Sequence, residues 1–106
     1  MTPVKRRTNM PAYLVANYTI TDTDGYAAYP PAVAPTLVPF KGEVLVADFD
    51  SEVVEGKPLP VTIVVKFPSK DAAKAWYHSD EYQAVVRLRT DNTEGYVVFA
   101  DGAPVE

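Results

Sequence analysis

The order of strand-like and helix-like segments constrains the fold of this chain more than any other feature. Four segments, 12–20, 43–50, 61–67 and 95–101, alternate apolar side chains with a period of two, which is typical of strands. A stretch with helical spacing follows the first strand and another follows the third. The order predicts an α+β domain of ferredoxin-like β-α-β-β-α-β topology. Its four-stranded antiparallel sheet would carry both helices on one face.

The first helical stretch is unusual because it is rich in proline, which costs roughly 3 kcal/mol inside a helix. Three of its prolines recur every four residues and therefore share one face: Pro31, Pro35 and Pro39. The opposite face carries an apolar stripe: Tyr26, Tyr29, Val33, Leu37 and Phe40. Missing N–H donors are tolerated best on the outer side of a curved helix. We expect a helix over 23–29, a break near Pro30, and a curved helix to residue 40 that ends at Gly42.

The second helical stretch contains an interruption of its own. Ser69 is expected to cap a helix that runs to about Tyr77, because a serine oxygen accepts an otherwise unpaired backbone N–H. His78 and Ser79 interrupt the pattern, and Ser79 is expected to cap a continuation over 80–89. The sequence therefore predicts a helix in two parts.

The sheet has too many apolar residues for one covered face. In the third strand Ile63 and Val65 point one way and Val64 the other, and in the last strand Val97 and Val98 point oppositely. Helices can cover only one of these faces, and a large apolar patch is rarely left in water. Stacking two copies about a two-fold axis would bury the second face, so we expect a homodimer through the open sheet face. The alternative is that the connection after Asp50 folds over that face.

Charge and composition exclude several classes of partner and site. The net charge is −4, and the cations Lys5, Arg6 and Arg7 gather at the start of the chain, so the body is strongly acidic. Such a body repels phosphate backbones, so no nucleic-acid partner is expected. The chain has no cysteine and one histidine, which argues against disulfides, thiol catalysis and cysteine-based zinc sites. A Mg²⁺ or Ca²⁺ site made of carboxylates alone stays possible but has no signature spacing in the sequence, so we expect no metal and no cofactor.

The length of 106 residues allows one folded domain. Residues 1–9 lack periodicity and are expected to form a tail, with the folded domain spanning 10–106. No apolar run approaches the ~20 residues needed to cross a bilayer, and no signal peptide is recognised, so no membrane partner is expected. The expected location is the cytoplasm.

Several short motifs resemble one bacterial family. They are the run from Pro11 to Ala16, the residues Tyr26 and Tyr29, the pair Glu55-Gly56, the run from Phe67 to Ser69 and the segment from Trp76 to Tyr82. Through these motifs, and above all through the segment from Trp76 to Tyr82, the chain resembles the family called domain of unknown function 1330. The resemblance covers roughly residues 10–102. It implies a dimeric α+β barrel, and it implies no particular reaction.

Two polar residues are candidates for catalysis. Histidine is the one residue type whose free pKa lies near neutral pH, and His78 lies at the helix interruption, so it suits a general acid or base. Asn17 is an amide in the middle of a strand, where it could bond a ligand carbonyl or oxyanion. The alternatives are an exposed turn histidine and an amide satisfied at the dimer face.

A further set of residues is expected to bind a ligand in the cleft between sheet and helices: Tyr26, Tyr29, Trp76, Glu81, Tyr82 and Arg89. The aromatic members could line a pocket or simply form the core. Arg89 shares a helical face with Tyr82, Val85 and Val86, so it is expected to point inward, where it needs an anionic partner. That partner could be Glu81. A buried pair of Glu81 with Arg87 or Arg89 could then hold a ligand carboxylate.

Asp48 and Asp50 are a third candidate, because they share a face at the end of the second strand and could act as paired carboxylates. Solvent exposure is the alternative. Overall the sequence is compatible with a metal-free enzyme acting on a small aromatic, keto or lactone-like metabolite. It is equally compatible with a non-catalytic small-molecule-binding module or a structural dimer module.

Overall fold

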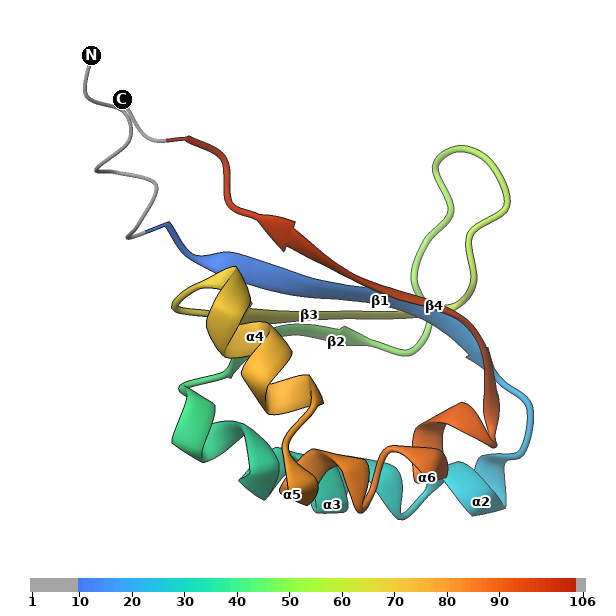
Figure 1. The fold of residues 1–106 in the computed structure, drawn as a ribbon. Coiled ribbons are helices and arrows are strands. Elements are labelled where there is room, and N and C mark those ends of the chain that lie inside the picture. The colour runs from blue at the N-terminus through green and yellow to red at the C-terminus, as the bar shows by residue number, and fades with distance from the viewer. Residues whose placement is uncertain (1–9, 105–106) are drawn as a thin grey trace.

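The computed structural model describes residues 10–104, and the tail expected over residues 1–9 lies outside them. The strands are β1 (Ala12–Ile20), β2 (Glu43–Asp48), β3 (Val61–Phe67) and β4 (Thr93–Asp101). They form one antiparallel sheet in the order β2-β3-β1-β4 (Figure 1). This order is that of the ferredoxin-like fold, so the predicted α+β topology is confirmed.

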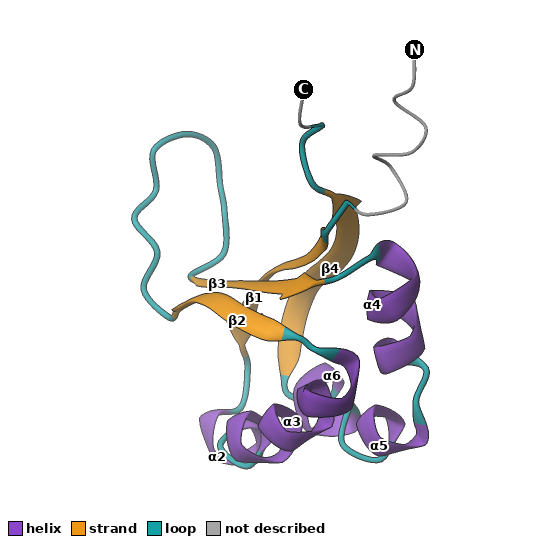
Figure 2. Ribbon diagram, turned by 90° about the vertical axis from the view of Figure 1, so that its left-hand side faces the viewer, coloured by secondary structure: helices purple, strands orange, loops and turns teal. Residues whose placement is uncertain are grey.

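All helices lie on one side of the sheet, as Figures 1 and 2 show. They are α2 (Thr23–Tyr26), α3 (Tyr29–Leu37), the 3₁₀ turn η1 (Val38–Phe40), α4 (Lys70–Tyr77), α5 (Asp80–Gln83) and α6 (Arg87–Thr90). None of the helices in this part of the chain is long and apolar enough to cross a membrane.

The first helical stretch breaks earlier than expected. The interruption lies at Ala27–Ala28, and Pro30 belongs to the first turn of α3, where a missing N–H has no intrahelical partner to lose. The three periodic prolines are exposed, as expected from their spacing: Pro31, Pro35 and Pro39. The stretch reaches Phe40 as expected, with the 3₁₀ turn η1 as its last turn, but the residue that takes the left-handed conformation after it is Lys41, with φ of 58°, and not Gly42.

The second helical stretch begins as predicted. The hydroxyl groups of Ser69 and Ser79 accept from the backbone N–H groups of Ala72 and Tyr82, and so cap α4 and α5. The predicted continuation over 80–89 is wrong in one respect, because it splits into α5 and α6. The inward face is kept across the split, since Tyr82 and Arg89 are both buried.

Strand β2 departs from the strict period of two expected over residues 43–50. A bulge between Val44 and Val46 adds a residue to the strand, so that Val44 pairs with Val65 and Val46 with Val64. Because a bulge shifts the alternation by one residue, Val44 and Ala47 share the helix-covered face, while Val46 lies on the open face. The strand also ends at Asp48, two residues earlier than expected.

The open face of the sheet carries exposed apolar side chains. Val46 is 40% exposed, Val98 46% and Tyr96 55%. The loop that joins β2 to β3 rises on this side, away from the helices (Figure 1). It bonds to the sheet near Asn17 and leaves those three side chains accessible.

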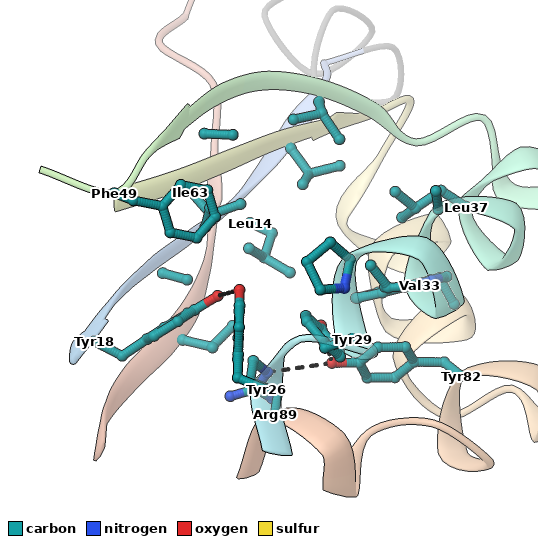
Figure 3. A pocket seen from close by; sticks show the side chains of 18 residues that line it. Leu14, Tyr18, Tyr26, Tyr29, Val33, Leu37, Phe49, Ile63, Tyr82 and Arg89 are labelled. Atoms are coloured by element: carbon teal, nitrogen blue, oxygen red, sulfur yellow. Dashed lines mark hydrogen bonds between the residues drawn. The ribbon is translucent and has the colours of Figure 1, made fainter. Parts of the chain in front are cut away.

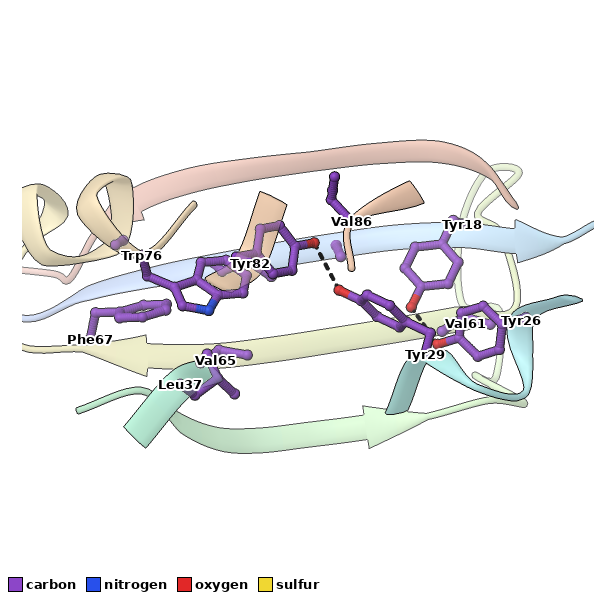
Figure 4. Packing of buried hydrophobic residues seen from close by; sticks show 13 residues of the cluster. Tyr18, Tyr26, Tyr29, Leu37, Val61, Val65, Phe67, Trp76, Tyr82 and Val86 are labelled. Carbon is purple, nitrogen blue, oxygen red and sulfur yellow. Dashed lines mark hydrogen bonds between the residues drawn. The ribbon is translucent and has the colours of Figure 1, made fainter. Parts of the chain in front are cut away.

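The core lies between the sheet and the helices and is strongly aromatic (Figure 4). Trp76 on α4 is 2% exposed and its ring lies 4.0 Å from that of Tyr82 and 5.5 Å from that of Phe67. Its Nε1 donates to Thr36 Oγ1 over 2.9 Å, and Thr36 Oγ1 donates to the carbonyl of Val33. The polar side-chain atoms of Trp76 and Thr36 therefore both have partners within the fold.

Candidate functional site

A cavity of about 220 Å³ lies between the sheet and the helices (Figure 3). Strands β1, β3 and β4 form its floor and helix α3 its opposite wall. Most of its surface is apolar, and the side chains include Leu14, Ala16, Val33, Leu37, Ile63 and Val65. Because small-molecule sites are concave and mostly apolar with a few placed polar groups, this cavity is the candidate binding site.

The cavity opens to the surface between α3 and the edge strand β2. The lining residues that are exposed come from these two elements and from the residue just after β2: Pro30, Ala34, Val44, Ala47 and Phe49. Phe49 contacts Tyr26 edge-on, with ring centroids 6.4 Å apart. A half-exposed phenyl ring thus stands at the mouth, in contact with a tyrosine inside.

The polar groups of the cavity gather at one end. The hydroxyls of Tyr29 on α3 and Tyr82 on α5 are 2.8 Å apart. The Nε of Arg89 on α6 donates to Tyr82 Oη over 3.4 Å (Figure 3). Three short helices therefore bring together three side chains that are far apart in the sequence.

Arg89 is a buried cation without a carboxylate. It is 9% exposed, and the two ion pairs within residues 10–104 are Lys70–Asp101 and Arg87–Asp91, both at the surface. Burial lowers the pKa of Arg89, but the nearby oxygens of Tyr82 and Tyr29 outweigh burial and raise it above its ordinary value. The guanidinium therefore stays charged inside the fold.

A second hydroxyl pair lies beside the first. Tyr18 on β1 and Tyr26 on α2 are hydrogen-bonded over 2.8 Å (Figure 4). Burial raises the pKa of Tyr18, Tyr26 and Tyr29, and the hydroxyl neighbours raise it further for Tyr18 and Tyr29. These phenols remain protonated at neutral pH, so they are hydrogen-bond donors and not bases.

The structure brings together five of the six expected ligand-binding residues. Tyr26, Tyr29, Trp76, Tyr82 and Arg89 all line the cavity. Glu81 does not, because its side chain is exposed on the outer side of α5. The expected pair of Glu81 with Arg87 or Arg89 is therefore not formed, and Arg87 pairs instead with Asp91 at 3.2 Å.

Asn17 lies on the other face of the sheet. Its amide nitrogen donates to the carbonyls of Leu59 and Val61, each over 2.8 Å, and its amide oxygen accepts from the N–H of Leu59 over 2.9 Å. The side chain is 8% exposed and fixes the end of the β2–β3 loop against the sheet. The geometry gives it a structural role and does not bring it to the cavity.

His78 also lies outside the cavity. It is exposed at the C-terminal end of α4, where it lines a second, more open depression with Lys74, Tyr77, Val97 and Phe99. Its ring stacks edge-on against that of Tyr77, with centroids 5.4 Å apart. The two candidate catalytic residues are therefore not brought together, nor does either join the tyrosine cluster.

Asp48 and Asp50 are both exposed to solvent, which was the alternative to their acting as paired carboxylates. A carboxylate oxygen of Asp48 accepts from the backbone N–H of Asp50 over 2.8 Å, which stabilises the turn after β2. No group of three or more His, Cys, Asp or Glu side chains within the described residues is placed to hold a metal ion.

Among the aromatic residues that line the cavity, the sequence did not identify Tyr18 and Phe49. Tyr18 could have been found, because the alternation in β1 places it on the covered face, where a buried hydroxyl needs a partner. Phe49 could not, because the bulge in β2 that sets the face of this strand has no clear signal in the sequence.

The arrangement provides an apolar chamber with hydrogen-bond donors at one end. Neither a carboxylate nor a histidine is among the described residues that line it. It can therefore hold an apolar molecule and stabilise negative charge on one of its oxygens. Its own side chains offer no obvious general base.

Comparison with known proteins places these features in a family. Residues 11–103 match the family described as domain of unknown function (DUF1330). No curated protein matches the chain.

Solved structures share the fold at low sequence identity. A protein of unknown function from Rhodopseudomonas palustris is 14% identical, covers 94% of this chain and 90% of its own, and has a TM-score of 0.74. SnoaB, a cofactor-independent oxygenase from Streptomyces nogalater, is 7% identical over 91% and 96% of the two chains, with a TM-score of 0.62. A dimeric protein of unknown function with a ferredoxin-like fold from Bacteroides fragilis is 12% identical over 89% and 97%, with a TM-score of 0.54.

Proposed function

This chain belongs to the DUF1330 family, and we propose that it is a homodimeric protein that binds a small, largely apolar organic molecule between its sheet and its helices. The observation that carries the proposal is the cavity of about 220 Å³ with Tyr29, Tyr82 and Arg89 at one end. Core space is normally filled, because proteins pack as densely as organic crystals. A chamber of this size that opens at a surface mouth is therefore better explained by a ligand than by packing.

Acetophenone, a small aromatic ketone, is a suitable first probe. Ligand-observed NMR should detect its binding to the wild-type protein. The Ala34→Trp variant should abolish that binding, since Ala34 is exposed at the mouth and a large ring there blocks entry without disturbing the core. The matched control is Ala75→Trp, at an exposed position of α4 that does not line the cavity, and it should bind like wild type. Equal binding by both variants would contradict the cavity as the site.

The homodimer is supported by the exposed apolar side chains of the open face and by the dimeric structural neighbour. Light scattering should return twice the chain mass of 11.6 kDa. Val98→Lys places a charge in the middle of the open face and should produce a monomer. Val38→Lys changes an equally apolar residue on the helical side, which is 73% exposed, and should remain dimeric. A monomeric wild type at micromolar concentration would contradict this part of the proposal.

A second candidate is a metal-free enzyme that acts on a small aromatic, keto or lactone-like molecule. Two observations favour it: the fold is shared with a cofactor-independent oxygenase, and the hydroxyls of Tyr29 and Tyr82 are placed to stabilise an oxyanion on a bound carbonyl. The test is the exchange of the methyl hydrogens of acetophenone in D₂O, which reports enolate formation: solvent hydroxide or water that enters the open cavity takes the methyl proton, the tyrosine hydroxyls stabilise the enolate oxygen, and D₂O returns a deuteron to carbon. Enzymatic exchange should exceed the buffer rate and fall in Tyr29→Phe. Exchange at the buffer rate would contradict the enzyme candidate and leave the binding function standing.

A further inference from the structure

We infer that the ligand is a small organic monoanion, whose oxyanion is held by Arg89 together with the hydroxyls of Tyr29 and Tyr82. The inference rests on the proposed binding function and adds the chemical class of the ligand. It follows from the charge at the end of the cavity, from the balance of donors and acceptors there, and from the size of the chamber.

Arg89 carries a charge that no carboxylate of the described residues pairs. A buried guanidinium is costly unless an anion or a set of acceptors replaces its water. Arg89 has a phenol oxygen at 3.4 Å and no carboxylate within ion-pair distance among residues 10–104. Arg87, two residues away on the same short helix, already has Asp91 at the surface. The inward arginine therefore lacks the partner that the outward one has.

The polar end of the cavity has more hydrogen-bond donors than acceptors. Tyr29 and Tyr82 share one hydrogen bond, so one of their two hydroxyl protons is left over, and the same holds for Tyr18 and Tyr26. Arg89 adds guanidinium N–H groups beyond the one that its Nε donates to Tyr82. No carboxylate or amide side chain lines the described cavity to accept these protons. A carboxylate or enolate oxygen only accepts, so it is the complementary group.

The rest of the cavity has the size and the apolar walls that suit a small ring. An apolar protein cavity of about 150 Å³ holds a benzene molecule. The present cavity of about 220 Å³ therefore has room for one ring with a charged substituent. Its apolar walls, Leu14, Val33 and Ile63, lie on the side away from Arg89 in Figure 3. The ligand class is thus a one-ring or similarly sized apolar body with a single planar oxyanion.

The test compares benzoate with acetophenone, which has nearly the same shape and no charge. Isothermal titration at pH 7 should show that the wild-type protein binds benzoate at least ten-fold more tightly. In Arg89→Gln this preference should disappear. In the matched control Arg87→Gln, which removes an exposed arginine from the same helix, the preference should remain.

Each outcome decides between the two claims. Equal affinity of the wild type for both compounds would overturn the anion inference and leave the binding function intact. Binding of neither compound would contradict both. Because the preference is measured first in the wild type, it does not depend on the folding of Arg89→Gln. Arg89→Lys is a second variant that keeps the positive charge, and it should retain a reduced preference for benzoate. If a folded Arg87→Gln variant lost benzoate binding completely, the assignment of the anion site to Arg89 would be overturned.

Discussion

Asn17 and Arg89 are two buried polar side chains on opposite faces of one sheet, and their surroundings differ. Asn17, on the open face, donates to two backbone carbonyls and accepts from one backbone N–H, all within 2.9 Å. Arg89, on the covered face, donates to the hydroxyl of Tyr82 over 3.4 Å, has the hydroxyl of Tyr29 nearby, and has no carboxylate of the described chain within ion-pair distance. A satisfied polar group indicates a structural role, whereas a buried charge without its counter-charge points to a partner that comes from outside.

The comparison requires that the covered face is a rigid core apart from its cavity, and Trp76 tests this with the largest expected effect. Trp76→Ala should lower the free energy of unfolding by about 3–5 kcal/mol, because it removes a buried aromatic that packs on Phe67 and Tyr82. Denaturant titration measures the change. Val38→Ala, at an exposed position of the same layer, should change stability by less than about 0.5 kcal/mol. A loss below ~1 kcal/mol in Trp76→Ala would mean that this end of the layer is loosely packed.

Removing the amide on the open face should have the next largest effect. Asn17→Ala leaves the N–H of Leu59 and two carbonyls without their partner, which should cost about 1–3 kcal/mol. Hydrogen exchange should accelerate in residues 51–60, because the loop loses its attachment to β1. Binding of acetophenone should be unchanged.

The control for this variant is Thr19→Val, two residues further along the same strand, in which the new side chain has nearly the same size as the old one. Thr19 lies on the same face as Asn17 and its exchange pattern should resemble that of the wild type. If Asn17→Ala abolished ligand binding while the fold remained intact, the distinction between a structural and a functional polar residue would fail.

The smallest effect on stability is expected at Arg89. Arg89→Met keeps an unbranched apolar stem and removes a buried charge that has no carboxylate, so the free energy of unfolding should change by less than about 1 kcal/mol. The substitution can even raise the free energy of unfolding, because residues that are kept for function are often not the most stabilising ones at their positions. A loss above ~2 kcal/mol would show that Arg89 is a structural residue like Asn17.

Much of the fold was predictable because its signals are local. Strands β1 and β3 have the expected bounds, and Ser69 and Ser79 cap their helices as their hydroxyls suggest. The inward direction of Arg89 was predictable from its helical spacing to Tyr82, and this spacing survives the split between α5 and α6.

The site was predictable only in part because its limits depend on distant contacts. The bulge in β2 moves Val44 and Phe49 to the cavity, and it arises from pairing with β3. From the sequence alone Asn17 resembles a catalytic amide. In the structure its amide is hydrogen-bonded to Leu59, which lies more than forty positions later in the chain. His78 was a candidate because of its chemistry and its place at the helix interruption, but in the structure it is exposed at the end of α4.

The most direct test of the account is the response of the arginine side chains to benzoate. The chain has four arginines, so their Nε–H resonances in a nitrogen–proton correlation spectrum are few enough to assign by comparison with the Arg89→Gln variant. On titration with benzoate, the resonance missing from the Arg89→Gln spectrum should shift most, because the anion lies against that guanidinium. The Arg87 resonance should stay in place, since Arg87 is exposed and paired with Asp91. A bound benzoate that leaves the Arg89 resonance unmoved would contradict the account.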